Sequence, residues 1–201
     1  SDHIGGLEYL ALFKRYLSGN NLNKLKMIIT PKYRKALWNY SLRGGMEWNE
    51  SNQSNKSLQF DDYFEEVNPV LVKNTRRETY CIDFNGIKLE IFTTNHIPDT
   101  ANSLHEAYIS YGLFVDDRLF ISCDTKFDTE LLNIYAPKSE ALFHDCSFFP
   151  NPVHTSIQEL RTLPDDVKSK LYLMHYSDDY AKYDVSTFAG LAMQGERYIF
   201  D

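Results

Sequence analysis

Tyr80-Cys81-Ile82-Asp83-Phe84-Asn85-Gly86-Ile87-Lys88-Leu89-Glu90-Ile91-Phe92 is the stretch that decides the fold class. Apolar and polar residues alternate on both sides of Asn85-Gly86. Successive side chains of a strand point to opposite faces, so this period of two predicts two strands with one buried face. Asn-Gly supplies the positive φ angles of a tight turn, and the stretch therefore predicts an antiparallel hairpin.

The flanking sequence predicts a layered fold in which strands come first and then alternate with helices. A second hairpin is expected from 111–115 to 118–122 across Asp116-Asp117. Beyond it we expect a helix from Asp128 or Thr129 to 135, strands at 141–144, 170–174 and 196–200, and a helix at 155–163. Before the first hairpin we expect an amphipathic helix after Gly6, a strand at 26–29, and a helix from Thr30 to Leu42 that ends at Gly44-Gly45. This order predicts an α/β (α+β) class and a single domain over residues 1–201.

Composition narrows the classes of partner and compartment. The chain has 21 basic and 28 acidic residues and a net charge of −7, which disfavours a large nucleic-acid partner. No apolar run reaches the ~18 residues that a transmembrane helix needs, so no membrane partner is expected. The three cysteines are an odd number without framework spacing, which predicts a reducing, cytoplasmic compartment. None of them forms a CxxC pair, which argues against thiolate-bound zinc.

Histidines stand where predicted elements begin or end, which is where functional side chains gather. These histidines are His3, His96, His144, His154 and His175, and Asp124 follows the apolar run 119–121 in the same way. A single histidine of this kind is more often structural, but imidazoles together with carboxylates suit zinc or manganese.

The order of these residues resembles a known family. Asp2-His3 resembles the end of the His-x-His-x-Asp-His motif of the metallo-β-lactamase fold, and His96, Asp124 and His175 fall where that fold places later ligands. The segments 144–148 and 154–156 are similar to paired motifs of its ribonuclease Z branch. The segments 37–46 and 171–176 resemble the anti-Pycsar type of cyclic-nucleotide phosphodiesterase within that branch. The resemblance implies an αββα sandwich whose N-terminal strands are missing, because the chain is expected to be truncated within the first motif.

The resemblance also implies a role for each residue. Asp2, His3 and His175 would hold one Zn²⁺, with Mn²⁺ as an alternative, and Asp124 would bridge to a second ion that His96 binds. Asp2 and His154 would be catalytic, with His154 protonating the leaving oxygen. His144 and Asp145 would orient ligands and phosphate. Cys123 stands where the family usually has glycine.

The predicted function is metal-dependent hydrolysis of 3′,5′-cyclic mononucleotides by a homodimer. Zinc lowers the pKa of a bound water from about 15.7 to about 7, which suits hydrolysis at neutral pH. One alternative is a tRNA 3′-processing endonuclease of the ribonuclease Z type, although only 28 positions separate His96 from Asp124 and leave no room for a long substrate-binding arm. Another is a degenerate, non-catalytic metallo-β-lactamase fold, since the preceding His-x-His ligands would lie before Ser1. The metal, the phosphodiester substrate and the oligomeric state stay open at this point.

Overall fold

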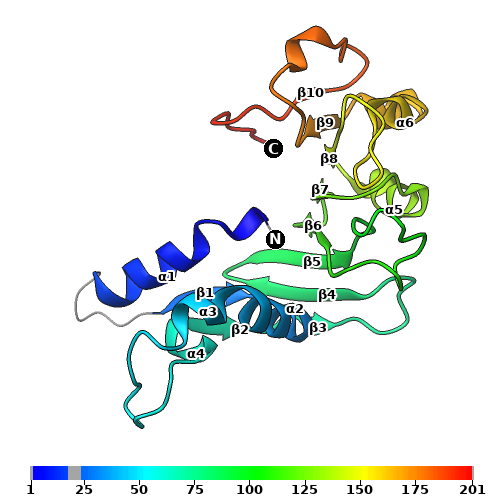
Figure 1. The fold of residues 1–201 in the computed structure, drawn as a ribbon. Coiled ribbons are helices and arrows are strands. Elements are labelled where there is room, and N and C mark those ends of the chain that lie inside the picture. The colour runs from blue at the N-terminus through cyan, green and yellow to red at the C-terminus, as the bar shows by residue number, and fades with distance from the viewer. Residues whose placement is uncertain (1, 18–23, 201) are drawn as a thin grey trace. The chain divides into compact units, whose positions relative to one another are not determined.

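The computed structural model describes residues 2–17 and 24–200 (Figure 1). The chain divides into two compact units, Ser1–Pro69 and Val70–Asp201. Each unit is considered by itself below, and whether they form the single domain predicted from the sequence stays a prediction.

The second unit is built on one mixed sheet. Among its described residues, eight strands follow the order β10-β9-β8-β7-β6-β5-β4-β3. Neighbours from β3 to β7 are antiparallel, and neighbours from β7 to β10 are parallel. The strands are β3 (Val70–Leu71), β4 (Thr79–Phe84), β5 (Ile87–Thr93), β6 (Tyr111–Val115), β7 (Leu119–Ile121), β8 (Ala141–Asp145), β9 (Leu171–Met174) and β10 (Gly190–Leu191). The predicted α/β class is confirmed.

Both predicted hairpins are present. β4 and β5 pair from Thr79 with Phe92 to Phe84 with Ile87, and Asn85 and Gly86 take φ angles of 56° and 83°. Positive φ at both turn positions is the geometry that an Asn-Gly hairpin turn adopts. Asp116 and Asp117, between β6 and β7, likewise have positive φ.

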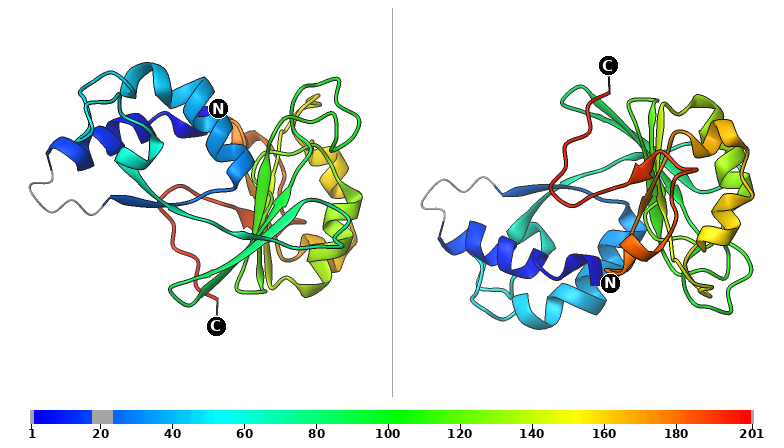
Figure 2. Two further views of the ribbon diagram at one scale, coloured as in Figure 1. Left: turned by 90° about the horizontal axis from the view of Figure 1, so that it is seen from below. Right: turned by 90° about the horizontal axis from the view of Figure 1, so that it is seen from above.

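Helices α5 (Thr129–Tyr135) and α6 (Ile157–Arg161) lie on one face of this sheet (Figure 2). Of the two predicted caps, Asp128 caps α5 by accepting a 2.9 Å hydrogen bond from Leu131 N. A short α7 follows at Asp165–Lys168, with 3₁₀ turns at Ala136–Lys138 and Tyr180–Lys182. The core between sheet and helices centres on Tyr135, whose ring stacks on Phe92 at 4.4 Å.

The prediction of a last strand at 196–200 was wrong. That segment has no strand pairing, and the last strand is β10. Side chains hold the segment instead: the Tyr198 hydroxyl donates to Leu191 O, and its ring packs edge-on against Phe143 and Tyr172. The alternation of aromatic residues therefore reflects side-chain packing without a backbone ladder.

The first unit has its own core and a two-stranded parallel sheet of β1 (Leu25–Ile28) and β2 (Phe64–Val67). Its helical segments are a 3₁₀ turn at Asp2–Ile4, α1 (Leu7–Tyr16), α2 (Pro31–Leu37), a π-helical turn at Trp38–Leu42, α3 (Arg43–Met46) and α4 (Phe60–Tyr63). The predicted end of a helix at Gly44-Gly45 was wrong, because neither glycine has the positive φ of a C-terminal stop. A Cβ at Gly45 would meet the Glu8 carboxylate, so this glycine leaves room beside α1.

Within the residues that the structure describes, no helix is both long and apolar enough to cross a membrane.

Candidate functional site

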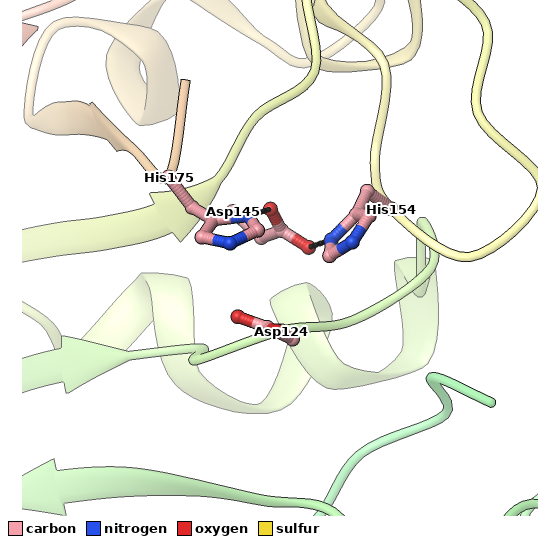
Figure 3. A group of neighbouring side chains, drawn as sticks. All are labelled: Asp124, Asp145, His154 and His175. Atoms are coloured by element: carbon pink, nitrogen blue, oxygen red, sulfur yellow. Dashed lines mark hydrogen bonds and ion pairs between the residues drawn. The ribbon is translucent and has the colours of Figure 1, made fainter. Parts of the chain in front are cut away.

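Polar side chains meet at one edge of the sheet in the second unit. Asp145 ends β8, Asp124 follows β7 and His175 follows β9, and these three parallel strands end at the same edge (Figure 3). β5 runs in the same direction as β7, because both are antiparallel to β6, so His96 also leaves the sheet at this edge. The carboxyl ends of parallel strands are the usual place for a ligand site in α/β proteins.

Two of the turns that leave this edge have left-handed backbone. Cys123 has a φ of 50° and His175 a φ of 62°. Non-glycine residues adopt this conformation at a cost of about 1–3 kcal/mol, and such residues cluster at functional sites. The glycine that the resembled family usually has at the position of Cys123 is therefore what the backbone favours. Burial raises the pKa of the Cys123 thiol to about 11, so the thiol is neutral at physiological pH.

Asp145 holds two imidazoles in place. Its Oδ2 lies 2.7 Å from Nδ1 of His154 and accepts the Thr125 N–H at 2.9 Å, while Oδ1 lies 3.3 Å from Nδ1 of His175. Burial alone would raise the pKa of this fully buried carboxyl, but its contacts with His154, His175 and Thr125 lower the pKa below the usual value. The ionised carboxylate thus orients the His154 ring through Nδ1 and faces Nδ1 of His175, an arrangement similar to carboxylate–histidine–metal triads.

His96 has its tautomer fixed from the other side of the site. Its Nδ1 lies 2.9 Å from the Val153 carbonyl oxygen, which can only accept, so Nδ1 carries the proton. The lone pair of Nε2 then lies 3.7 Å from Oδ2 of Asp124. A cation between two acceptors at this distance would interact favourably with both.

The donor set fits a divalent cation. Asp124, Asp145, His154 and His175 each offer one ligand atom, and these atoms lie within 4.8 Å of one another. Oδ1 of Asp145 is buried without a hydrogen bond of good geometry among the described residues, which is costly for an ionised oxygen unless a cation is near. Carboxylates with imidazoles are ligands that Zn²⁺ and Mn²⁺ accept.

The structure thus brings together five of the predicted site residues: His96, Asp124, Asp145, His154 and His175. Asp145 was predicted to orient ligands, and its carboxylate also lies within 4.8 Å of the other candidate ligand atoms. The division of these residues into ligands, acid and orienting groups stays a prediction.

Two further predicted site residues belong to the first unit. Asp2 and His3 lie in the 3₁₀ turn Asp2–Ile4, where the His3 side chain is exposed and the Asp2 side chain falls outside the described residues. Their roles as ligands, and the catalytic role of Asp2, stay predictions.

His144 is fully buried in the second unit and donates from Nδ1 to the backbone carbonyl of Asp145 at 2.8 Å. Its ring lies 6.2 Å from that of Phe120 in the core. Burial lowers the pKa of His144, so the ring stays neutral in the folded protein.

The burial of His144 predicts an acid-sensitive fold. Below about pH 6.5 His144 binds a proton in the unfolded chain but stays neutral in the folded protein. The free energy of unfolding therefore decreases by up to about 1.4 kcal/mol for each pH unit below that value. His144→Asn keeps an N–H donor and removes this term. Denaturant unfolding of metal-free protein from pH 5.0 to 7.5 should therefore give a shallower slope for the variant. If stability falls with pH equally steeply in the wild type and in His144→Asn, the neutral state assigned to folded His144 is contradicted. Asp145 does not disturb the comparison, because its lowered pKa affects stability only below about pH 4.

Sequence reasoning missed the groups that support the ligands. The Thr125 N–H and the Val153 carbonyl orient Asp145 and His96, and Lys126 fastens the loop after His96. The only signal in the sequence was position, since Thr125-Lys126 directly follow Asp124.

Comparison with known proteins agrees with the resemblance seen in the sequence. The family model described as Anti-Pycsar protein Apyc1 matches residues 1–198. The chain belongs to the Apyc1 family. It is 34% identical to the Anti-Pycsar protein Apyc1 of Paenibacillus harenae over 189 residues, covering 93% of this chain and 69% of that protein. It is 33% identical to the Apyc1 protein of Bacillus phage vB_BsuM-Goe3, covering 89% of this chain and 66% of that protein.

A solved structure, described as a new diphosphatase from the PhnP family, is similar at a TM-score of 0.47 and 12% identity, covering 84% of this chain and 55% of that one. A likeness of this size supports no conclusion about the function of this chain. The chain thus spans about two thirds of the two Apyc1 relatives and little over half of the diphosphatase.

Proposed function

We propose that this chain carries the metal-binding and proton-transfer groups of a phosphodiesterase that hydrolyses 3′,5′-cyclic mononucleotides to linear nucleotides. The observation that supports this most directly is the cluster around Asp145, whose carboxylate lies 2.7 Å from Nδ1 of His154 and 3.3 Å from Nδ1 of His175, with Asp124 beside them. Membership of the Apyc1 family, whose name refers to action against Pycsar, favours a cyclic nucleotide as the substrate.

The ligand assignment follows the family resemblance. Within the second unit, His175 and Asp124 would bind one Zn²⁺ or Mn²⁺, and Asp124 with His96 would bind a second. Divalent ions in such a site act as Lewis acids on phosphoryl oxygens and acidify a bound water. The chain's own residues contribute to the ligand geometry, because the Val153 carbonyl fixes the tautomer of His96 and the Asp145 carboxylate lies 3.3 Å from Nδ1 of His175.

His154 would act as the general acid. Its Nδ1 lies 2.7 Å from Oδ2 of Asp145, which orients the ring so that Nε2 points away from that carboxylate. A proton on Nε2 would pass to the ester oxygen that departs from phosphorus. Asp145 would thereby couple proton delivery to ligand orientation, because it also lies 3.3 Å from His175.

The test is turnover by the natural full-length protein that contains this chain. With Zn²⁺ or Mn²⁺ we expect release of linear nucleotide from cyclic AMP, GMP, CMP or UMP, and loss of turnover on chelation. Cleavage of a tRNA precursor without cyclic-nucleotide turnover would favour the ribonuclease Z alternative. Absence of both reactions in metal-loaded protein would favour a degenerate fold retained for binding.

We also propose a homodimer. Within the first unit, α1 and the residue that ends it expose large apolar side chains: Tyr9, Leu10, Phe13, Tyr16 and Leu17. A contiguous apolar surface of this kind usually marks an interaction site. Light scattering of the full-length protein at micromolar concentration should give the mass of a dimer, and a monomer mass would contradict this part of the proposal.

A further inference from the structure

The side chain of Lys126 fastens the loop that follows His96. Its Nζ donates to three backbone carbonyl oxygens of the 98–101 segment: Pro98 O at 3.1 Å, Asp99 O at 2.9 Å and Ala101 O at 2.7 Å. An ammonium group has three N–H donors, and all three are used here. The segment therefore closes around the end of Lys126 as carbonyl ligands close around a cation.

The chemistry of this contact requires lysine. Three carbonyl oxygens converge on one nitrogen, and an ammonium is a compact charge that can satisfy all three at once. A guanidinium spreads its donors over a planar fork and does not match a single point of convergence. Ala101 is itself buried, so the contact ties the loop to the body of the second unit.

The backbone on the near side of His96 is fastened to the same short segment. Lys126 N donates to Asn95 O at 2.6 Å, Thr125 Oγ1 donates to Asn95 O at 3.2 Å, and Thr94 Oγ1 donates to Asp124 O at 3.2 Å. His96 therefore lies between two attachment points, Asn95 before it and the 98–101 segment after it, and Lys126 supplies a bond to both.

We propose that Lys126 is a positioning residue that holds the loop after His96 and so keeps the His96 ring opposite Asp124. The inference rests on the proposed function only in its consequence for metal binding. The Nε2 of His96 and Oδ2 of Asp124, 3.7 Å apart, would share one ion, and their spacing depends on how the two loops are fastened. Lys126 touches neither atom and acts through the backbone.

The chain offers a matched control in Lys170. Its Nζ also donates to backbone carbonyl oxygens, Ala136 O at 2.7 Å and Ser139 O at 2.8 Å, at the end of α5. Lys170→Met therefore removes the same kind of contact from a part of the unit that carries no site residue. Both lysine-to-methionine changes keep an unbranched side chain and remove the charge.

The first measurement is hydrogen exchange in the natural full-length protein without metal. We expect peptides covering 97–108 to exchange about tenfold faster in Lys126→Met than in the wild type, and to be unchanged in Lys170→Met. Tyr108 N, which donates to Ile97 O at 2.7 Å, is the internal reporter of loop closure. Unchanged exchange over 97–108 in a folded Lys126→Met protein would overturn the proposal. If that variant does not fold, Lys126→Gln, which keeps two donors, takes its place with the same criteria.

The second measurement is calorimetric titration with Zn²⁺. Removing a group that orients a ligand typically weakens metal binding 10–100-fold, so we expect that loss for the more weakly bound ion in Lys126→Met and wild-type affinity in Lys170→Met. If zinc affinity falls equally in Lys126→Met and Lys170→Met, the loss reflects general destabilisation, and the positioning role of Lys126 is overturned. A wild-type protein that binds no zinc would contradict the proposed function, and the exchange measurement would still decide the role of Lys126.

Discussion

Replacing His154 with glutamine should lower the rate of cyclic-nucleotide hydrolysis by about 10²–10⁴-fold, the usual contribution of a positioned general acid. The glutamine amide can still reach the Asp145 carboxylate, but it has no titrating proton to give to the departing oxygen. The variant should retain the wild-type metal content, since in this assignment His154 is not a ligand.

The leaving group separates this role from a structural one. With bis(p-nitrophenyl) phosphate, nitrophenolate departs without a proton, so the wild type and His154→Gln should differ by less than tenfold. A loss as large as that for cyclic AMP would exclude the general-acid role. A loss of bound zinc would instead make His154 a ligand, a position that its place among the clustered ligand atoms also allows.

Replacing Asp145 with asparagine should weaken metal binding by about 10–100-fold, the range seen when a carboxylate behind a metal-ligating histidine is removed. Oδ2 accepts bonds from both His154 and Thr125, so the amide oxygen of the variant should stay there. The amide nitrogen then faces Nδ1–H of His175 at the position of Oδ1, 3.3 Å away, where two donors oppose each other. His175 can relieve this only by moving its proton to Nε2, the atom that would bind the ion.

Asp128 provides the matched control for Asp145. It accepts a hydrogen bond from Leu131 N and pairs with the buried Arg77 at 3.1 Å, but it takes no part in the cluster of ligand atoms. Asp128→Asn keeps the helix cap, because asparagine caps as well as aspartate, and it loses the ion pair. We expect lower stability and unchanged zinc affinity. Wild-type zinc affinity in Asp145→Asn would contradict the supporting role of Asp145.

Local sequence patterns predicted much of the sheet of the second unit. The Asn85-Gly86 hairpin and the Asp128 cap follow from the chemistry of a few neighbouring residues, and the structure has both. The strand expected at 196–200 failed because aromatic alternation also suits a segment held by its side chains, as Tyr198 is. The periodicity of a sequence indicates which side chains are buried. It does not indicate whether the backbone of that segment pairs with another strand.

The residues of the site could be found from the ends of predicted elements, but their contacts could not. Asp145 reaches His175 across thirty positions, and Lys126 reaches Pro98 across twenty-eight. Such contacts depend on the order of strands in the sheet, which no local pattern specifies. The preference for glycine at the position of Cys123 has a physical reason only once its left-handed backbone is seen.

The division of the sheet into an antiparallel and a parallel half has a consequence for the order of assembly. The hairpins β4–β5 and β6–β7 close short loops, whereas β7, β8 and β9 meet only after crossovers that contain α5 and α6. Contacts distant in sequence cost more loop-closure entropy and form slowly. We therefore expect the cluster of Asp124, Asp145 and His175 to form late, after the barrier for folding. A bound ion should then slow unfolding while leaving the refolding rate nearly unchanged. The metal would in that case stabilise the folded protein kinetically, by lengthening its lifetime before unfolding.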